Sequence, residues 1–113
     1  MGKLENYRVC VQEVIQKLAS YKTLYGDALE AQTIFDTTHD HYQLVRVGWP
    51  SNNKRIYGCV VHIDIKDEKI WIQYDGTEIG MANELVELGV PKEDIILAFH
   101  APYKRPYTGF GVG

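Results

Sequence analysis

Hydrophobic residues near the start of the chain recur at intervals of three and four positions. The stripe consists of Leu4, Tyr7, Val11, Val14, Ile15 and Leu18. This spacing is typical of an amphipathic α-helix that lays one side on a core, and it predicts a helix over residues 3–22. The helix is expected to stop around Tyr25, Gly26 and Asp27, because glycine accepts the left-handed conformation that ends many helices.

The period then changes to two. Four segments rich in β-branched and aromatic residues follow, at about 29–36, 41–49, 55–65 and 69–75. Only short polar stretches connect these segments, whereas parallel neighbours would need crossovers of about a dozen residues or more. The pattern therefore predicts a four-stranded antiparallel meander.

Alternation within the strands predicts a sheet with one apolar face and one more polar face. In the third strand, the apolar face is expected to carry Tyr57, Cys59, Val61, Ile63 and Ile65. In the fourth strand, Ile70, Ile72 and Tyr74 are expected to oppose Trp71 and Gln73. The more polar face then carries His62 and Asp64, with Trp71 and Gln73 as cross-strand neighbours. Trp49 and Trp71 are interpreted as core or half-buried sheet residues.

A second helix is predicted after the fourth strand. Thr77 is expected to cap it, with Glu78 in its first turn. Its apolar side consists of Ile79, Ala82, Leu85 and Val86. Gly89 should end it, and Gly80 in its first turn should cost up to about 1 kcal/mol relative to alanine. Residues 95–99 are predicted to form a fifth strand, which a crossover of this length can place parallel to the fourth.

The C-terminal segment, residues 100–113, is aromatic, basic and interrupted by proline. Flexible tails usually lack large aromatic side chains, so we expect Tyr103, Tyr107 and Phe110 to dock on the domain itself or on a neighbour. Together the patterns predict a single α+β domain over residues 1–113. Its order is an N-terminal helix, a four-stranded antiparallel meander, a second helix, a short fifth strand and an extended aromatic C-terminal tail.

Composition and charge narrow the function classes. The 113 residues, 45% hydrophobic and 24% charged, are ordinary for one globular domain. Because there is no run of about 18 apolar residues and no apolar secretion signal, we expect a cytoplasmic location without membrane contact. The net charge of −3 disfavours autonomous binding to duplex DNA. Cys10 and Cys59 are expected to be buried, reduced thiols, too few for a disulfide framework or a zinc site.

Two polar groups offer candidate chemistry. His62 and Asp64, two positions apart on one strand, could act as a general base and its orienting group. No motif places a serine or cysteine nucleophile beside them, so a polar ladder on the sheet is the preferred interpretation. His39, Asp40 and His41 lie at a hairpin, and a His-x-His pair with no third ligand in view is weak evidence for a metal site. We interpret that group as a solvated turn.

A third group is acidic. Asp64, Asp67 and Glu68 invite comparison with a metal-dependent nuclease, which needs carboxylates that converge on one divalent ion. Asp67 and Glu68 are instead typical turn residues, and the sequence contains no phosphate-binding loop or dinucleotide fingerprint. We therefore expect no catalytic residue, no cofactor and no metal, and we expect that the protein is not an enzyme.

In the tail, Lys104 and Arg105 lie between Tyr103 and Tyr107. This composition can stack on single-stranded nucleic acid, but the two charges are few, and aromatic residues with arginine are common at the centre of protein interfaces. A protein interface is the preferred interpretation. The predicted partner-binding residues are Tyr103, Lys104, Arg105, Tyr107 and Phe110 in the tail, with His62 and Trp71 on the sheet.

Several short segments, taken in their order along the chain, resemble those of a known protein family. The first half contains YQLVRVGW (42–49), RIYGC (55–59), HIDIKD (62–67) and KIWIQ (69–73). The second half contains DGTE (75–78), ELV (84–86), GVPKEDI (89–95) and the tail residues Phe99, His100, Pro102, Arg105 and 107–110. Over nearly the whole chain these segments closely resemble the XisI family, the fdxN-element excision controlling factors of cyanobacteria. Gly80 and the final Gly-Val-Gly depart from the family pattern.

The resemblance implies an accessory role in the site-specific excision of a DNA element during differentiation of nitrogen-fixing cells. In that system a separate recombinase cuts and rejoins the DNA, and XisI acts with a companion protein, XisH. The family offers no established catalytic residues to carry over. The leading hypothesis is a non-enzymatic factor that binds an XisH-like protein and so affects that protein or a recombinase, with only indirect DNA contact. An acidic domain suits a basic, DNA-acting partner.

Two other hypotheses stay open. Direct DNA binding by an excisionase-like factor predicts a basic stripe within the fold or in a dimer. Its residues would include Lys54, Arg55, Lys104 and Arg105. An enzyme centred on His62 and Asp64 predicts a deep pocket that converges on those two side chains. The sequence leaves the oligomeric state open, including a homo-oligomer.

Overall fold

A computed structural model of the chain describes residues 2–21, 23 and 25–113. Its helices are α1 (Lys3–Ala19), α2 (Met81–Glu87) and the short 3₁₀ turns η1 (Gly26–Ala28), η2 (Lys92–Asp94) and η3 (Pro102–Tyr107). Its strands are β1 (Leu29–Asp36), β2 (His41–Ser51), β3 (Lys54–Lys66), β4 (Lys69–Asp75) and β5 (Ile95–Leu97). The α+β class and the order of the elements are confirmed.

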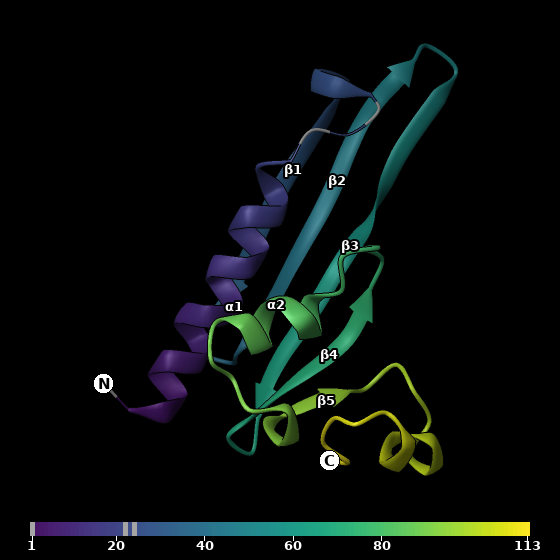
Figure 1. Ribbon diagram of the computed structural model, residues 1–113. Coiled ribbons are helices and arrows are strands. Elements are labelled where there is room, and N and C mark those ends of the chain that lie inside the picture. Colours follow the sequence, from purple (N-terminus) through teal and green to yellow (C-terminus); the bar gives the residue numbers. More distant parts are fainter. Residues whose placement is uncertain (1, 22, 24) are drawn as a thin grey trace.

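One sheet organises the molecule. Its strands lie in the order β1-β2-β3-β4-β5. The first four are antiparallel neighbours, and β5 runs parallel to β4, with Ile70 opposite Ile95. Both the predicted meander and the predicted parallel fifth strand are therefore confirmed. The helices α1 and α2 lie side by side over the same face of the sheet (Figure 1), where Lys17 Nζ is 3.3 Å from Glu84 Oε2.

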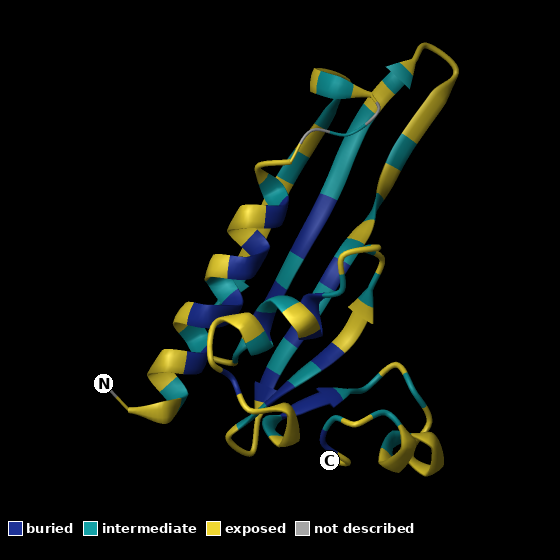
Figure 2. Cartoon of the chain, viewed as in Figure 1, coloured by how far each residue is buried: buried dark blue, intermediate teal, exposed yellow. Residues whose placement is uncertain are grey.

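The core lies between these helices and the sheet. The stripe of α1 is buried from Tyr7 to Leu18, as its spacing predicted, and it meets buried residues of the central strands such as Leu44, Ile63 and Ile72. Each fully buried side chain of this size contributes roughly 1.5–3 kcal/mol. The outer ends of β2 and β3 extend beyond α1, and their residues are mostly half-buried or exposed (Figure 2).

The end of α1 differs from the prediction. The helix ends at Ala19, before residue 22, which lies outside the described residues. The Ser20 hydroxyl donates to the carbonyl of Lys17 at 2.6 Å, and the Ser20 N–H donates to Gln16 and Lys17. Serine thus satisfies the last helical carbonyls, and the glycine at position 26 is not needed as the stop.

A bulge in β3 overturns part of the predicted alternation. Leu44 is paired with Val61, whereas the next residue, Val45, is paired with Cys59, so Val60 is an extra residue. One extra residue reverses the direction of every side chain beyond it. The prediction that Tyr57 and Cys59 face the core is therefore wrong: Tyr57 is 73% exposed and Cys59 is an exposed residue. Cys10 is buried, as expected.

A second bulge has the same effect in β4. His62 is paired with Tyr74, and Ile63 is paired with Ile72, so Gln73 is the extra residue. Ile70 and Ile72 are buried as predicted, but Tyr74 lies on the same face as His62 and is exposed. Tyr74, and not Gln73, is therefore the cross-strand neighbour of His62.

The start of α2 also differs. The helix begins at Met81, four residues after Thr77, because Gly80 has a φ of +85° that a helix cannot accommodate. The Met81 N–H donates to the Asp75 carboxylate at 2.8 Å, and the Gly80 N–H donates to the Thr77 hydroxyl at 3.1 Å. Glycine is thus suited to its place outside the helix, and the predicted cost of Gly80 within a helical turn does not arise. The helix ends before Gly89 as predicted.

The tail folds back on the domain. It contains the 3₁₀ helix η3 where an extended segment was expected, and β5 is shorter than predicted. Gly111 makes an isolated parallel bridge with Ile96, and its N–H donates to the carbonyls of Lys92 and Ile95 at 3.0 and 2.9 Å. The tail therefore lies along the outer edge of β5. Among the described helices, none combines the length and apolar character that crossing a bilayer requires.

Candidate functional site

The sheet face opposite the helices carries a row of polar and aromatic side chains. The register places His41 opposite Asp64 and Gln43 opposite His62, on the adjacent strands β2 and β3. On the other side of Asp64, β4 contributes Trp71. The polar ladder predicted for His62, Asp64 and Trp71 is thus present in the register.

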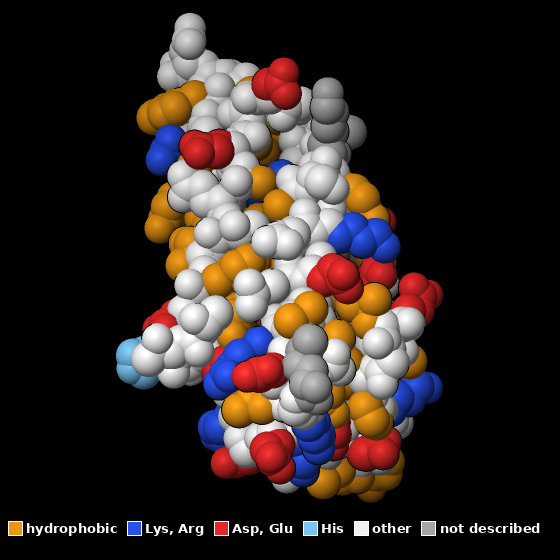
Figure 3. Space-filling view, turned by 90° about the vertical axis from the view of Figure 1, so that its left-hand side faces the viewer, with side chains coloured by type: hydrophobic (Ala, Val, Ile, Leu, Met, Phe, Trp, Pro, Cys, Tyr) orange, Lys and Arg blue, Asp and Glu red, His pale blue; other side chains and the backbone are white. Residues whose placement is uncertain are grey.

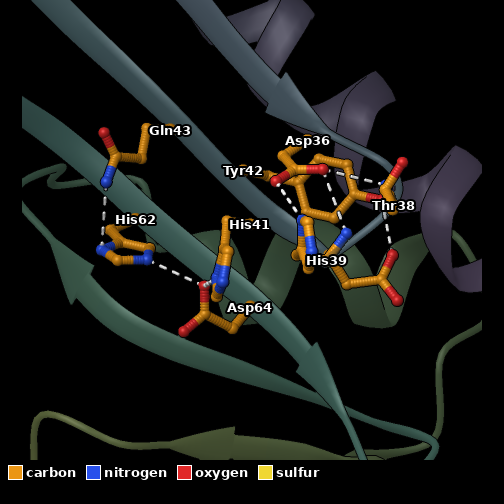
Figure 4. A network of polar contacts seen from close by, with 9 residues as sticks. Asp36, Thr38, His39, His41, Tyr42, Gln43, His62 and Asp64 are labelled. Atoms are coloured by element: carbon orange, nitrogen blue, oxygen red, sulfur yellow. Dashed lines mark hydrogen bonds and ion pairs between the residues drawn. The ribbon is translucent and has the colours of Figure 1, made fainter.

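Asp64 is the centre of this row. Its Oδ1 lies 2.8 Å from Nδ1 of His41 and 2.8 Å from Nε2 of His62 (Figure 4). Gln43 Nε2 approaches the other nitrogen of His62 at 3.4 Å. We call His41, His62 and Asp64 the His–Asp–His cluster. Its carboxylate side chain is 18% exposed, and the hydrogen bond to Asp64 raises the pKa of His41.

The cluster corrects the interpretation of residues 39–41 as one solvated turn. Only His39 fits it: this side chain is exposed, and its Nδ1 lies 2.9 Å from Asp36 in the same turn. His41 is the first residue of β2 and points toward Asp64. Sequence spacing within 39–41 could not show this, because the partners of His41 lie on another strand. The sequence signal that did point to this cluster was the polar pair His62 and Asp64 on β3.

Asp40 serves the fold. Its carboxylate accepts two hydrogen bonds from Arg8 of α1, at 2.8 and 3.1 Å, and one from the Tyr42 hydroxyl at 2.9 Å. The Arg8 guanidinium holds the pKa of Asp40 below its usual range. This contact joins the β1–β2 turn to α1. Asp67 and Glu68 lie exposed at the β3–β4 turn with positive φ, as expected for turn residues.

The tail and the sheet meet at Trp71. The Trp71 indole donates to the carbonyl of Lys66 at 3.0 Å. Its ring centroid lies 4.7 Å from the Lys66 ammonium and 5.7 Å from the Arg105 guanidinium. Arg105 also donates to the carbonyls of His100 and Ala98, at 3.1 and 3.4 Å. Two residues predicted for partner binding, Arg105 and Trp71, are therefore in contact with each other.

The other predicted tail residues point in different directions. Tyr103 is 73% exposed and Tyr107 is 88% exposed. Lys104 is also exposed, and its ammonium lies 5.8 Å from the Tyr103 ring centroid. Phe110 is half-buried and packs against the core. The tail thus anchors itself through Phe110 and Arg105 while it presents two tyrosines to solvent.

A second aromatic and basic group lies at the far end of the sheet. Trp49 is exposed, contrary to the core or half-buried position predicted for it, because β2 extends past α1 at this point. Arg55 lies 5.6 Å from the Trp49 ring centroid, and Lys54 lies 5.8 Å from that of Tyr25. A groove of about 470 Å³ lies beside this group, between Tyr25 and Tyr57.

The four basic residues suggested for a DNA-binding stripe are divided between the two ends of the molecule. Lys54 and Arg55 start β3 at the hairpin tip, whereas Lys104 and Arg105 belong to η3 at the opposite end (Figure 1). On the side of the molecule that lies to the left in Figure 1, basic and acidic side chains are interspersed (Figure 3). A single chain therefore does not assemble the predicted stripe from these four residues.

Comparison with known proteins supports the sequence resemblance. The chain matches the family model described as XisI protein over residues 1–112. The chain belongs to the XisI family. One similar crystal structure, an XisI-like protein from Anabaena variabilis ATCC 29413, has 46% identity and a TM-score of 0.88, with 97% of this chain and 99% of that chain covered.

A second crystal structure is that of the fdxN element excision controlling factor XisI from the same organism. It has 34% identity and a TM-score of 0.83, and the match covers 99% of this chain and 100% of that chain. Among curated proteins, the comparison found no match. In this XisI domain, the segments at 62–67 and 69–73 that carried the resemblance lie mainly in the paired parts of β3 and β4, and they hold His62, Asp64 and Trp71.

Proposed function

We propose that the chain is a non-enzymatic accessory factor that controls the site-specific excision of a DNA element by binding another protein. Membership of the XisI family supports this proposal, as does the likeness to a protein named as an fdxN element excision controlling factor. The proposed partner is an XisH-like protein, through which the chain affects the recombinase without direct DNA contact. Its acidic net charge of −3 favours association with a basic, DNA-acting partner.

The proposed contact surface is the exposed part of the tail. We call Tyr103, Lys104 and Tyr107 the tail surface, and the Trp71–Arg105 contact lies next to it in the fold. The observation that carries the proposal is the exposure of Tyr103 and Tyr107 on a segment whose backbone is held in place. Arg105 bonds two carbonyls of the preceding loop, and Gly111 bonds two carbonyls near β5.

Such an arrangement suits binding. Exposed tyrosines on an ordered segment lose little conformational freedom when a partner covers them, and large aromatic residues often dominate the binding energy of an interface. His62 and Trp71 extend the proposed surface from the tail onto the sheet.

The test is co-purification and calorimetric titration with the XisH-like protein of the same organism. The variant combines Tyr103→Ala with Tyr107→Ala. The matched control is Tyr57→Ala at the other end of the sheet, because Tyr57 and Tyr103 are both 73% exposed. We expect the tail variant to raise Kd by about tenfold or more, as loss of interface hot spots does, and we expect the control to leave Kd nearly unchanged. An equal change in Kd for the two variants would show that the tail surface is not the contact surface.

Direct DNA binding is the second candidate, and the hairpin tip is the observation in its favour. There Lys54 and Arg55 lie over exposed aromatic rings, a combination that can stack on single strands. A gel shift with the purified protein alone checks it. Binding that weakens steeply with salt and is lost on Lys54→Ala and Arg55→Ala would support direct binding and argue against the protein-mediated role.

A further inference from the structure

Two imidazoles and one carboxylate converge on one point of the exposed sheet face. Their ligand atoms all lie within 4.8 Å of one another, and both ring nitrogens lie 2.8 Å from Asp64 Oδ1. Two imidazoles with one carboxylate are a donor set that divalent transition metals bind. We propose that His41, His62 and Asp64 form a binding site for a divalent transition metal ion, with zinc as the ion that fits best.

Zinc binding requires movements of roughly an ångström in the histidine side chains. Zinc holds nitrogen and oxygen ligands at about 2.0–2.2 Å, so the ligand atoms around it stand roughly 3.3–3.5 Å apart. Starting from contacts of 2.8 Å, each histidine nitrogen needs to move away from Asp64 Oδ1 by about half an ångström. The two histidine nitrogens, which lie within 4.8 Å of each other, also need to approach to this same ligand spacing. Side-chain rotation supplies this shift, because the His41 side chain is 57% exposed.

The two strands also hold the ligands in place. His62 and Asp64 alternate along β3 with Val61, Ile63 and Ile65, which are buried on the helix-covered face. His41 precedes the fully buried Tyr42 on β2. Ligands on strands that are fixed by core packing keep their geometry better than ligands on loops.

Gln43 supplies a supporting contact of the kind that metal-bound histidines have. When Nε2 of His62 binds a metal, the ring proton lies on Nδ1, which then needs an acceptor. The Gln43 carboxamide is 3.4 Å from this nitrogen, and it becomes the acceptor if its oxygen is turned toward the ring. Without a metal, the same carboxamide donates from Nε2 while His62 donates to Asp64.

The donor types select the class of ion. Magnesium and calcium prefer shells made of oxygen, whereas imidazole nitrogen suits zinc and its neighbours among the transition metals. Three protein ligands leave at least one coordination position of zinc open. That position faces solvent, because the cluster lies on the open side of the sheet and His41 is largely exposed. Water or a side chain of a binding partner can therefore complete the shell.

The chain contains a matched control for this site. His39 and Asp36 are also an exposed imidazole and carboxylate in contact, with 2.9 Å between His39 Nδ1 and Asp36 Oδ2. Among the described residues, no second histidine joins that pair to make a three-ligand group. If one His–Asp contact were enough to bind the metal, His39 would contribute as much as His41.

The test is an isothermal titration of the chelator-treated full chain with zinc chloride, and separately with magnesium chloride. We expect one saturable zinc site with a micromolar or lower Kd, and no saturable magnesium binding. His41→Ala and His62→Ala should each raise the zinc Kd by about tenfold or more. His39→Ala should leave it unchanged.

Nuclear magnetic resonance of the unmodified protein provides a readout that does not depend on how the variants fold. Zinc should shift the imidazole signals of His41 and His62 and leave those of His39 in place. Circular dichroism of His41→Ala checks its fold, and this variant changes the most exposed ligand. If the folded wild-type chain binds no zinc, the proposal is overturned, and the cluster is only a set of hydrogen-bonded side chains. Zinc binding that survives both His41→Ala and His62→Ala would also overturn the proposal.

Discussion

Arg8 and Asp40 form a two-point ion pair that joins helix α1 to the turn between β1 and β2. The guanidinium Nε and Nη2 donate to the two carboxylate oxygens at 2.8 and 3.1 Å. Both side chains are partly shielded from water, at 29% and 13% exposure. Such bidentate contacts are stronger than single surface ion pairs.

Asp40→Asn should therefore destabilise the fold by about 1–3 kcal/mol. Asparagine tolerates the positive φ of this position, so the backbone is preserved while the charge is lost. Urea denaturation at neutral pH measures the change. The control is Asp67→Asn, which also replaces an aspartate with positive φ but at an exposed turn, and it should change stability by less than about 0.5 kcal/mol.

The same ion pair predicts a pH dependence. Arg8 lowers the folded-state pKa of Asp40 below its ordinary 3.8, so the unfolded chain takes up the proton first as the solution is acidified. The stabilisation is therefore complete above about pH 5 and is lost as the pH falls through the lowered folded pKa. Wild-type stability should fall more steeply below this pH than that of Asp40→Asn. Parallel curves for the two proteins would show that the ion pair adds nothing.

Tyr7→Phe tests a second anchor in the N-terminal half of α1. The buried Tyr7 hydroxyl donates to Asp94, just before β5, and Lys3 Nζ lies 3.0 Å from the same carboxylate. Loss of the hydroxyl should cost about 1–2 kcal/mol, because a part-buried carboxylate loses a donor. Lys3→Ala should cost less, since its side chain is 47% exposed. Thermal unfolding of both variants compares the two contributions, and an equal loss would contradict this ranking.

Gly111→Ala should release the tail from β5. A Cβ at this position would lie 2.4 Å from the carbonyl oxygen of Glu93, which is backbone and cannot turn aside. We expect faster proteolysis within residues 100–113 and a loss of about 1–3 kcal/mol from overpacking. Gly58→Ala is the control, because a Cβ there has no heavy atom within 4 Å. Similar proteolysis of the two variants would mean that the close approach at Gly111 does not hold the tail.

Thiol labelling tests the bulge in β3. The native protein should react with iodoacetamide at Cys59 and not at Cys10, since only Cys59 is exposed. The reaction should be slow at neutral pH, because desolvation raises the pKa of the Cys59 thiol and little thiolate is present. Mass spectrometry of the labelled peptides identifies the site. Labelling of Cys10 before unfolding would contradict the packing of α1.

The sequence predicted the elements better than their details. Periodicity located α1, all four antiparallel strands and the parallel fifth strand, because these follow from local spacing and connection length. It missed the extra residues Val60 and Gln73, which are defined only by pairing with a neighbouring strand. That error placed Tyr57, Cys59 and Tyr74 on the wrong face.

The residues of the candidate site were also predicted only in part. His62, Asp64 and Trp71 were found from their alternation along the strands. His41 was assigned to a turn, since its contact with Asp64 spans 23 positions and depends on the register of β2 and β3. The end of α1 at Ala19 depends on the Ser20 hydroxyl, which hydrogen-bonds the carbonyl of Lys17. The late start of α2 depends on the Asp75 carboxylate, which accepts from the N–H of Met81.

The C-terminal segment covers the outer edge of β5, so the two edges of the sheet differ in how open they are to a further strand. Gly111 occupies hydrogen-bonding positions beside Ile95 and Ile96, whereas β1 is the outermost strand at the other margin. An additional strand can pair along β1 more readily than along β5. If two chains associated through β1, the free edge of each sheet would be paired with the other. Strand addition would then stop at a dimer and would not continue into a filament.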